Sequence, residues 1–282
     1  MNRPAQGAPP APSFVYEVTM QSRRAHVRRD TTAWILDDKL AAYRFAAAIG
    51  LRVPAVSPRP LAHTELALSP GTVAKPLEGL MSQGVFIIGR DSIFDLERNE
   101  YLASVEEVRA RVAASVATGR IATDAWIEEE LVTSDVDPSS PARDIKFYSF
   151  YGQVGLALET VRGDGVRRCW YNAKGEVVTT GKYTRELFAG HGIPDGLIEL
   201  AAETSLAVPA PFLRIDFLAS PTGPVLNEFT PKPGGASQFN ASTDRRLGSM
   251  LVAAAGRLHA DLLGGRDFPA FKKVRAELSE RR

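Results

Sequence analysis

The sequence has little of three features that would narrow its function at once: cysteine, excess charge and long apolar runs. Its single cysteine, Cys169, excludes an internal disulfide and any metal site built from a cysteine cluster. It carries 34 lysines and arginines against 33 aspartates and glutamates, a net charge of +1, so no overall field favours nucleic acid or a membrane surface. No apolar run approaches the length of a membrane span. We therefore expect a cytoplasmic globular protein with no nucleic-acid or membrane partner.

Composition divides the 282-residue chain into four expected parts. Residues 1–13 are rich in proline and alanine and lack the basic and apolar regions of a secretory signal, so they are predicted to be a disordered leader. Residues 14–64 are expected to form a reduced N-terminal region. Two lobes of mixed α and β structure follow, over residues 65–134 and 135–282. The polar, proline-containing stretch at residues 133–144 marks the boundary between them.

Apolar periodicity and turn residues predict the elements of each part. Helices are expected over residues 37–50, 104–118, 194–207 and 245–263. Strands and hairpins are expected over residues 14–20, 71–76, 84–89, 125–132, 145–161, 167–183, 211–220 and 224–231. The glycine-containing loop at residues 77–83 is predicted to close over a ligand. The basic tail after Gly265 is expected to be peripheral.

Two apolar strands carry acidic residues where a core strand would have none. Because strand side chains alternate between faces, Arg214 and Asp216 share one face of LRIDF, and Glu228 and Thr230 share one face of VLNEFT. A hairpin would set these faces side by side. Carboxylates on a rigid sheet suit Mg²⁺, which prefers oxygen ligands and completes its shell with nucleotide phosphates and water. Asp216 and Glu228 are therefore the predicted metal ligands; the alternative is a surface Arg–Asp pair and a solvated edge glutamate.

The order of these motifs resembles that of the ATP-grasp enzymes. In that family an Arg-x-Asp strand is followed by a Glu-x-Asn strand that runs into a Pro-Gly turn, and here RIDF is followed by NEFTPKPGG. Upstream, DDKLAAYRFAAAIGLRVP resembles the family's lysine-bearing helix, GTVAKPLEGLMSQGV its nucleotide strand and loop, and AWIEEELV its adenine hinge. The resemblance runs from Asp37 to Leu263 and implies an α+β class and the ATP-grasp fold, with the nucleotide between two antiparallel sheets. The Glu-x-Thr form, together with DIKFYSFYGQV, resembles the branch associated with teichuronopeptide biosynthesis.

The resemblance implies ATP and Mg²⁺ as cofactors and gives individual residues a role. The residues implied to bind ATP are Lys39 and Lys75 at the phosphates, Leu131 and the backbone of Val132 beside adenine, Glu129 at the adenine amino group, and Asp135 or Asp137 at the ribose. Outside this resemblance, Lys39 is equally well a solvated helix residue and Lys75 an exposed lysine at a strand end.

The same resemblance implies the catalytic and metal-binding residues. Arg214 would steady phosphoryl oxygens or an oxyanion, and Lys146 would reach the terminal phosphate, although a structural lysine is an equal alternative. The implied metal ligands are Asp216, Glu228 and Thr230. Thr230 stands where many members have asparagine, and its hydroxyl is a weaker ligand. The glycine-rich turn after this strand either offers backbone amides to the reacting centre or is a simple tight turn.

The implied function is an ATP- and Mg²⁺-dependent ligase that activates a carboxylate as an acyl phosphate and joins it to an amine, forming an amide or peptide bond. Peptide, natural-product or surface-polymer biosynthesis is the expected setting, with small-molecule or peptide substrates. The alternatives are an ATP-grasp kinase that phosphorylates a hydroxyl and a non-catalytic nucleotide-binding protein. About 36 residues precede the lysine-bearing helix, too few for the α/β lobe with which the family usually begins. A homodimer partner, a carrier protein or the arginine-rich segment at residues 22–29 is therefore expected to assist substrate recognition.

Overall fold

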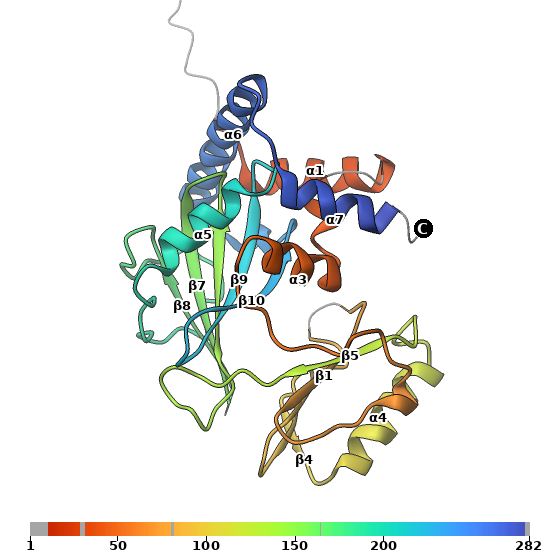
Figure 1. Ribbon diagram of the computed structural model, residues 1–282. Helices are drawn as coiled ribbons and strands as arrows, with labels where there is room; N and C mark the ends of the chain where they lie inside the picture. The colour runs from red at the N-terminus through yellow and green to blue at the C-terminus, as the bar shows by residue number, and fades with distance from the viewer. Residues whose placement is uncertain (1–10, 29–31, 80–81, 164, 280–282) are drawn as a thin grey trace, which may run out of the picture.

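The computed structural model describes residues 11–28, 32–79, 82–163 and 165–279. Most of the expected leader and part of the expected closing loop lie outside these ranges. Within them the chain forms two five-stranded sheets, in which every strand pair is antiparallel, and helices that pack around them (Figure 1). Among the described residues, none of the helices is long and apolar enough to span a membrane.

The first sheet is small and is covered by one helix. Its strand order is β4-β3-β2-β1-β5. The strands are β1 (Thr72–Pro76), β2 (Phe86–Ile88), β3 (Ile93–Asp95), β4 (Glu100–Leu102) and β5 (Trp126–Glu130). Helix α4 (Val105–Ala117) buries Val108 and Val112 in the same core as Trp126. Ser104 begins this helix as predicted, because its side chain accepts a hydrogen bond from the Glu107 N–H.

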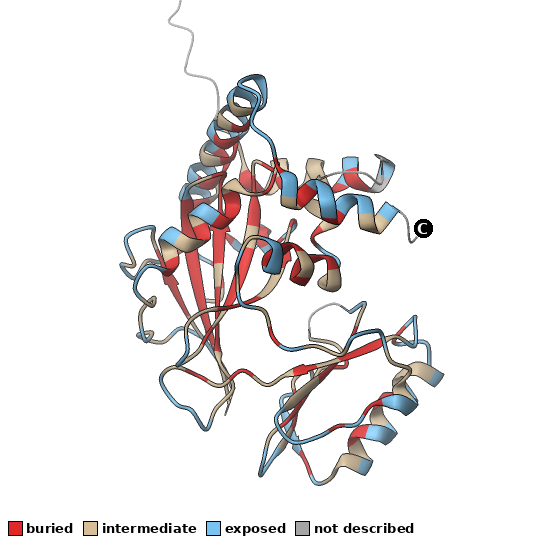
Figure 2. Ribbon diagram, in the orientation of Figure 1, coloured by how far each residue is buried: buried red, intermediate tan, exposed pale blue. Residues whose placement is uncertain are grey.

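The second sheet is larger and forms the centre of the main core. Its strand order is β10-β9-β6-β7-β8. The strands are β6 (Arg143–Ser149), β7 (Val154–Gly163), β8 (Gly165–Tyr171), β9 (Leu213–Ala219) and β10 (Val225–Thr230). Helix α5 (Leu197–Leu206) lies in front of this sheet and α6 (Ala241–Leu263) behind it (Figure 1). The buried residues concentrate on these strands and on the helix sides that face them (Figure 2).

The expected strand at residues 14–20 is wrong, because the segment belongs to helix α1 (Phe14–Arg28). Phe14, Val18, Ser22 and Ala25 are buried and follow one another at intervals of three or four residues, the spacing of one helix face. Helix α1 packs against α6, and the Val15 N–H donates to the Asp244 carboxylate at 2.9 Å. Seven residues are too few to distinguish the two-residue period of a strand from the 3.6-residue period of a helix.

The expectation of a peripheral tail after Gly265 is also wrong. Helix α7 (Pro269–Ser279) buries Phe271 and Val274, and the preceding Phe268 is buried as well. The ring of Phe271 meets that of Phe45 edge-on, with centroids 6.4 Å apart. The few apolar residues of this basic segment therefore close one side of the main core.

Helix α3 (Lys39–Ala48) lies between the two sheets (Figure 1) and matches the predicted helix at residues 37–50. The Asp38 side chain accepts a hydrogen bond from the Ala41 N–H at 2.8 Å, and Gly50 follows the helix with a φ of +82°. The helix follows the short α2 (Thr32–Ile35) and packs against β10 and α7. It therefore packs with the second sheet, while Lys39 in its first turn contacts the chain just beyond β1 of the first sheet.

A glycine in α6 tests how closely the N-terminal segment packs on that helix. A Cβ at Gly248 would lie 2.0 Å from the Pro12 carbonyl oxygen and 2.8 Å from the Phe14 nitrogen, whereas a Cβ at Gly256 would meet nothing within 4 Å. We expect Gly248→Ala to lower the free energy of unfolding by roughly 1–3 kcal/mol, since backbone must move. Gly256→Ala should raise it by roughly 0.5–1 kcal/mol, since alanine favours a helix. Urea unfolding measures both, and a Gly248→Ala protein as stable as Gly256→Ala would contradict the packing.

Candidate active site

The strand pair β9–β10 brings three predicted metal ligands and Arg214 together. Its register sets Asp216 opposite Glu228 and Arg214 opposite Thr230. Arg214 Nε donates to Asp216 Oδ1 at 2.7 Å, and its Nη2 donates to Asp216 Oδ2 at 2.6 Å. The same Nη2 reaches Glu228 Oε1 at 2.7 Å and Thr230 Oγ1 at 2.8 Å. One guanidinium therefore holds all three side chains on one face of the sheet.

Strand β6 adds Lys146 to this group from the other side of β9. Lys146 is opposite Asp216 in the register, and its Nζ donates to Asp216 Oδ2 at 2.6 Å. It also forms an ion pair with Asp144, two residues earlier on the same strand. We call this group the acid cluster; its members are Asp144, Lys146, Arg214, Asp216, Glu228 and Thr230.

The pKa values of the two central carboxylates of the acid cluster are shifted in opposite directions, although the same two cations lie beside both. Asp216 is fully buried, and burial raises its pKa to about 6 although Arg214 and Lys146 oppose the shift. Burial also acts to raise the pKa of Glu228, but Lys146 and Arg214 outweigh it and hold that pKa below the usual range. The Glu228 side chain keeps 39% of its exposure. Glu228 is therefore the ionised carboxylate that a ligand can reach from solvent.

The first sheet carries a second polar group around Lys75. The β1–β5 register sets Val73 opposite Glu129 and Lys75 opposite Ile127, so Lys75 and Glu129 are diagonal neighbours on one face. Lys75 Nζ lies 2.6 Å from Glu129 Oε1. The Tyr43 hydroxyl donates to Glu129 Oε2 at 2.8 Å and accepts from Lys75 Nζ at 3.2 Å. We call Tyr43, Lys75 and Glu129 the lysine cluster.

The charges of the lysine cluster are matched within it. Tyr43, Lys75 and Glu129 are each exposed by 6% or less. Burial acts to lower the pKa of Lys75, but Glu129 and Tyr43 outweigh it, so the pKa is raised and the ammonium is retained. Burial, with the neighbouring Glu129, raises the pKa of Tyr43, which keeps its hydroxyl protonated as a donor.

Lys39 connects the two clusters. Its Nζ donates to the Leu77 carbonyl oxygen, just beyond β1, at 3.4 Å. Burial and then the neighbouring Lys75 lower the pKa of Lys39, while Glu228 and Glu129 act in the opposite direction. Its ammonium is therefore close enough to both clusters for one carboxylate of each, Glu228 and Glu129, to act on its pKa.

The sequence profile of a family described as TupA-like ATP-grasp matches residues 18–252. The chain belongs to this ATP-grasp family. The match includes both clusters and helix α3. The expected family and the expected α+β ATP-grasp fold, with two antiparallel sheets, are confirmed. A search of curated protein sequences found no match.

Solved ATP-grasp structures resemble the chain at low sequence identity. A D-alanine–D-alanine ligase from Bacillus anthracis, complexed with ATP, has a TM-score of 0.46 and 14% identity over 80% of this chain and 68% of its own. The ATP-grasp ligase PsnB, complexed with a minimal precursor, has a TM-score of 0.42 and 13% identity over 79% and 61%. A RimK domain ATP-grasp protein from Sphaerobacter thermophilus has a TM-score of 0.44 and 13% identity over 79% and 68%. The chain thus spans 61% to 68% of the lengths of these proteins.

Some residues that the ATP-grasp resemblance singled out lie apart from both clusters. Asp135 forms a two-point ion pair with Arg143, at 2.7 Å for both contacts. Arg143 alternates with Asp144 along β6, so it draws Asp135 toward the sheet face opposite the acid cluster. Asp137 accepts hydrogen bonds from Ser139 and Ser140 in an exposed turn. The structure leaves neither carboxylate beside the lysine cluster.

The predicted adenine hinge follows β5. The Leu131 N–H donates to the Gly71 carbonyl at 2.9 Å, and the Val132 carbonyl accepts from the Ala142 N–H at 2.9 Å. Val132 is buried and Leu131 is half-buried. Glu129, placed by the resemblance at the adenine amino group, is instead ion-paired with Lys75.

Sequence reasoning gave no role to three residues that the structure brings to the clusters: Asp144, Tyr43 and Lys182. Tyr43 lies four residues after Lys39, so helical spacing places both on one side of α3, and this signal was available. Lys182 is 2% exposed and lies near Arg214 and Lys146. It follows a glycine in an irregular segment, where no periodicity marks it.

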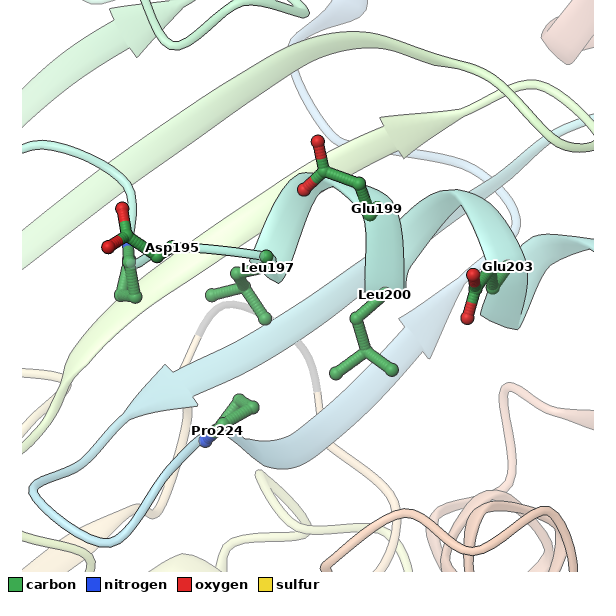
Figure 3. Close-up of a pocket in the computed structure, with 8 residues that line it drawn as sticks. Asp195, Leu197, Glu199, Leu200, Glu203 and Pro224 are labelled. Atoms are coloured by element: carbon green, nitrogen blue, oxygen red, sulfur yellow. The ribbon is translucent and has the colours of Figure 1, made fainter.

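A surface cavity of about 400 Å³ lies at the start of α5, away from these residues (Figure 3). Leu197 and Leu200 point from α5 toward the strands, and Glu199 points away from them (Figure 3). Asp195 and Glu203 complete its acidic edge, and Pro224 lies across from the helix. None of the lining residues belongs to the acid cluster or the lysine cluster, so the cavity is separate from the candidate active site.

The Tyr43 hydroxyl provides a test of the lysine cluster. Tyr43→Phe leaves one Glu129 oxygen without its donor in a buried setting, and we expect the free energy of unfolding to fall by about 1–2 kcal/mol. Tyr101 is 62% exposed, and Tyr101→Phe is the matched control, expected to change stability by less than about 0.5 kcal/mol. Urea unfolding compares the two; equal effects would mean that the hydroxyl does not stabilise the cluster.

Proposed function

We propose that this ATP-grasp protein is an ATP- and Mg²⁺-dependent ligase that activates a carboxylate as an acyl phosphate and joins it to an amine. The observation that carries the proposal is the placement of Asp216 and Glu228 opposite one another on one face of β9 and β10, held by Arg214. The substrates are proposed to be small-molecule or peptide acids and amines, and the cytoplasm the place of reaction.

The residues of the acid cluster fit Mg²⁺ that arrives with a nucleotide. Asp216, Glu228 and Thr230 supply only oxygen donors, the ligands that Mg²⁺ prefers. Among the described residues no group of three or more histidine, cysteine, aspartate and glutamate side chains is arranged to hold a metal. Two carboxylates are nevertheless the usual protein share of a magnesium site in which phosphates and water complete the shell. When bound, Mg²⁺ and ATP supply the phosphoryl group and a charge that stabilises its transfer.

The lysines of both clusters are proposed to bind the phosphates. Lys39 lies between the two clusters. Glu129 and Tyr43 hold the Lys75 ammonium on the same side of the first sheet, where the phosphates are proposed to bind. Phosphate oxygens would replace Glu129 as the partner of Lys75, since a lysine ammonium is a mobile point charge with three donors. The carboxylate so released is proposed to accept the adenine amino group. Leu131 and Val132 remain the proposed border of adenine. Asp135 remains the proposed ribose contact, a role for which its carboxylate would have to leave Arg143.

The acid cluster is proposed to stabilise the charge that develops in both parts of the reaction. In the first, a carboxylate oxygen of the acid forms a bond to the γ-phosphorus while the bond to the β–γ bridging oxygen breaks, giving an acyl phosphate and ADP. In the second, the amine nitrogen attacks the carbonyl carbon, the carbon–oxygen bond to phosphate breaks, and the nitrogen loses a proton. Lys146 and Arg214 present fixed positive donors to the transferring phosphoryl group and the oxyanion.

The proposed lobes separate the two clusters, although Tyr43 of the lysine cluster belongs to the N-terminal region. Lys75 and Glu129 fall within residues 65–134, and Asp216 and Glu228 within residues 135–282. The proposed boundary between residues 134 and 135 therefore separates the nucleotide lysine of β1 from the metal ligands of β9 and β10.

Replacing Glu228 by glutamine tests the metal site. We expect Glu228→Gln to lower ATP-dependent hydroxamate formation, measured with hydroxylamine and a panel of carboxylic acids, by at least about a hundredfold, since an ionised ligand is lost. Glu203→Gln, at the rim of the surface cavity, is the control and should retain activity. Near-normal ADP release by Glu228→Gln would refute the metal assignment.

The same assay separates the alternatives. A hydroxamate that requires both ATP and a carboxylic acid supports the ligase. A stable phosphorylated product in its place would identify a kinase. Tight nucleotide binding without turnover across a broad panel of acids and amines would identify a non-catalytic protein.

Removing the guanidinium tests whether Arg214 occupies the place of a cation. Arg214→Met leaves Asp216 and Glu228 facing each other, and we expect it to lower the free energy of unfolding by roughly 3–5 kcal/mol in the presence of a chelator. Millimolar Mg²⁺ should restore part of this loss and leave the unsubstituted protein nearly unchanged. Arg59→Met, which removes an exposed ion pair with Glu65, should have little effect on stability and be insensitive to Mg²⁺. Thermal unfolding with and without Mg²⁺ decides; equal Mg²⁺ responses of Arg214→Met and Arg59→Met would contradict the assignment.

A further inference from the structure

The segment that carries Lys182 is tightly held. Thr180 and Lys182 are each 2% exposed, and Gly181 between them has a φ of +84°. The Asn240 N–H donates to the Thr180 carbonyl at 2.8 Å, and Trp170 Nε1 donates to the Lys182 carbonyl at 3.1 Å. This segment therefore fixes the position of one lysine side chain.

The residue that follows is kept in an unfavourable conformation. Tyr183 has a φ of +61°, a left-handed conformation that is uncommon for a residue with a side chain. Its ring stacks on Trp170, with centroids 6.3 Å apart and planes at 12°, and the Arg168 guanidinium carbon lies 4.1 Å from its centroid. These contacts with Trp170 and Arg168 hold the Tyr183 ring in place and so maintain the strained backbone.

The Lys182 ammonium has one strong partner, and it is not an acid. Its Nζ donates to the Gly234 carbonyl oxygen at 2.5 Å. It also lies 4.7 Å from the ring centroid of Tyr183 and 5.4 Å from that of Phe239. No carboxylate of the described residues forms an ion pair with it, in contrast to Lys146 and Arg214.

Within the turn that receives this hydrogen bond, Gly234 and Gly235 are exposed and have no side chain to pack, although Pro233 and Ala236 on either side of them are buried. A Cβ at Gly234 would meet nothing within 4 Å, and at Gly235 the nearest atom would be Lys182 Cε at 3.3 Å. Two successive glycines lose more conformational freedom on ordering than any other pair. Besides the Lys182 contact, the Gln238 N–H bond to the Gly235 carbonyl at 3.1 Å closes the turn.

We propose that Lys182 is a positioning residue: it holds the Gly234 carbonyl and so fixes the glycine-rich turn, Gly234–Gly235, beside the acid cluster for the acid substrate. The proposal rests on the proposed ligase function. A methionine would pack between the Tyr183 and Phe239 rings without the desolvation of a charge, so the charge at this position has another use. The ammonium, unlike a methionine thioether, donates to the carbonyl that orders the turn.

The charge of Lys182 also depends on what is bound nearby. Burial first, and then the cations Arg214, Arg168 and Lys146 on β9, β8 and β6, lower its pKa to about 7. Above this pH the ammonium loses its proton and the bond to the Gly234 carbonyl weakens. Substrate anions that neutralise Arg214 and Lys146 would favour the protonated form, so that the turn becomes ordered as the acid and the phosphates arrive.

Hydrogen exchange tests, without reference to activity, whether the Lys182–Gly234 hydrogen bond orders the turn. In Lys182→Met the Gln238 and Phe239 amides, whose hydrogen bonds to the Gly235 and Ala236 carbonyls close the turn, should exchange at least about tenfold faster than in the unsubstituted protein, since one charged hydrogen bond is lost. Exchange in α6 and β9 should stay unchanged, which also shows that the variant is folded. Lys174→Met, an exposed lysine in another turn, is the control. Unchanged exchange at Gln238 and Phe239 in Lys182→Met would overturn the proposal.

Kinetics test whether the ordered turn serves the acid substrate. With hydroxamate formation as the assay, Lys182→Met should raise KM for the acid about tenfold and leave KM for ATP within about twofold. In the unsubstituted protein KM for the acid should rise above pH 7, and in Lys182→Arg this rise should be absent because a guanidinium stays protonated. An altered exchange pattern with an unchanged KM for the acid, or the same pH profile in all three proteins, would overturn the role in substrate positioning. Absence of hydroxamate from the unsubstituted protein would instead overturn the proposed ligase function and, with it, the role of Lys182 in substrate positioning. The exchange data would still decide whether Lys182 orders the turn.

Discussion

The carboxylate of Asp216 is fully buried at the centre of the second sheet, and the arrangement around it follows from the need to neutralise that charge. Burial alone would protonate it. Two cations neutralise it. Strand alternation places Arg214 on the same face two residues away, and the pairing of β6 with β9 places Lys146 opposite Asp216. Once Arg214 is held there, its remaining donor capacity draws Glu228 and Thr230 toward it. The position of the predicted metal ligands is thus a consequence of one buried charge and two strand pairings.

Helix α3 determines how this group stands relative to the first sheet. It packs on β10 and α7, yet its Lys39 and Tyr43 side chains bond to residues of the first sheet and the segment beyond it. The chain that leaves α3 continues the link, because the Arg52 carbonyl accepts from the Leu226 N–H of β10 while the Arg52 guanidinium reaches Glu130 of β5 at 2.7 Å. The N-terminal region therefore supplies Tyr43 to the lysine cluster and a backbone hydrogen bond to β10, so a shift of α3 would move the proposed phosphate-binding lysines and the proposed metal ligands together.

The sequence predicts most of this where one local rule decides the outcome. The period of two in LRIDF and VLNEFT places Asp216 and Glu228 on faces that a hairpin must bring together, and Asp38 and Gly50 mark the ends of α3. The rule fails where two periods fit a short window, as at Phe14, or where a few apolar residues lie in a basic segment, as at Phe271. It also cannot supply a contact that depends on register between distant strands. The pairing of Lys75 with Glu129, and the position of Lys182 beside Arg214, arise only from the assembled fold.

The balance of charge around the acid cluster bears on how the proposed Mg²⁺ and nucleotide would enter it. Arg214 and Lys146 already occupy both oxygens of Asp216 and one of Glu228, and Lys182 adds a cation that no carboxylate of the described chain pairs with. A bare divalent cation approaching this face would meet those positive charges and would have to displace the guanidinium. A metal that arrives bound to phosphates carries net negative charge, which the same cations attract, and its phosphates can take over Arg214 and the lysines as the metal takes the carboxylates. The charge distribution therefore favours entry of metal and nucleotide as one unit over a site that is loaded with metal beforehand.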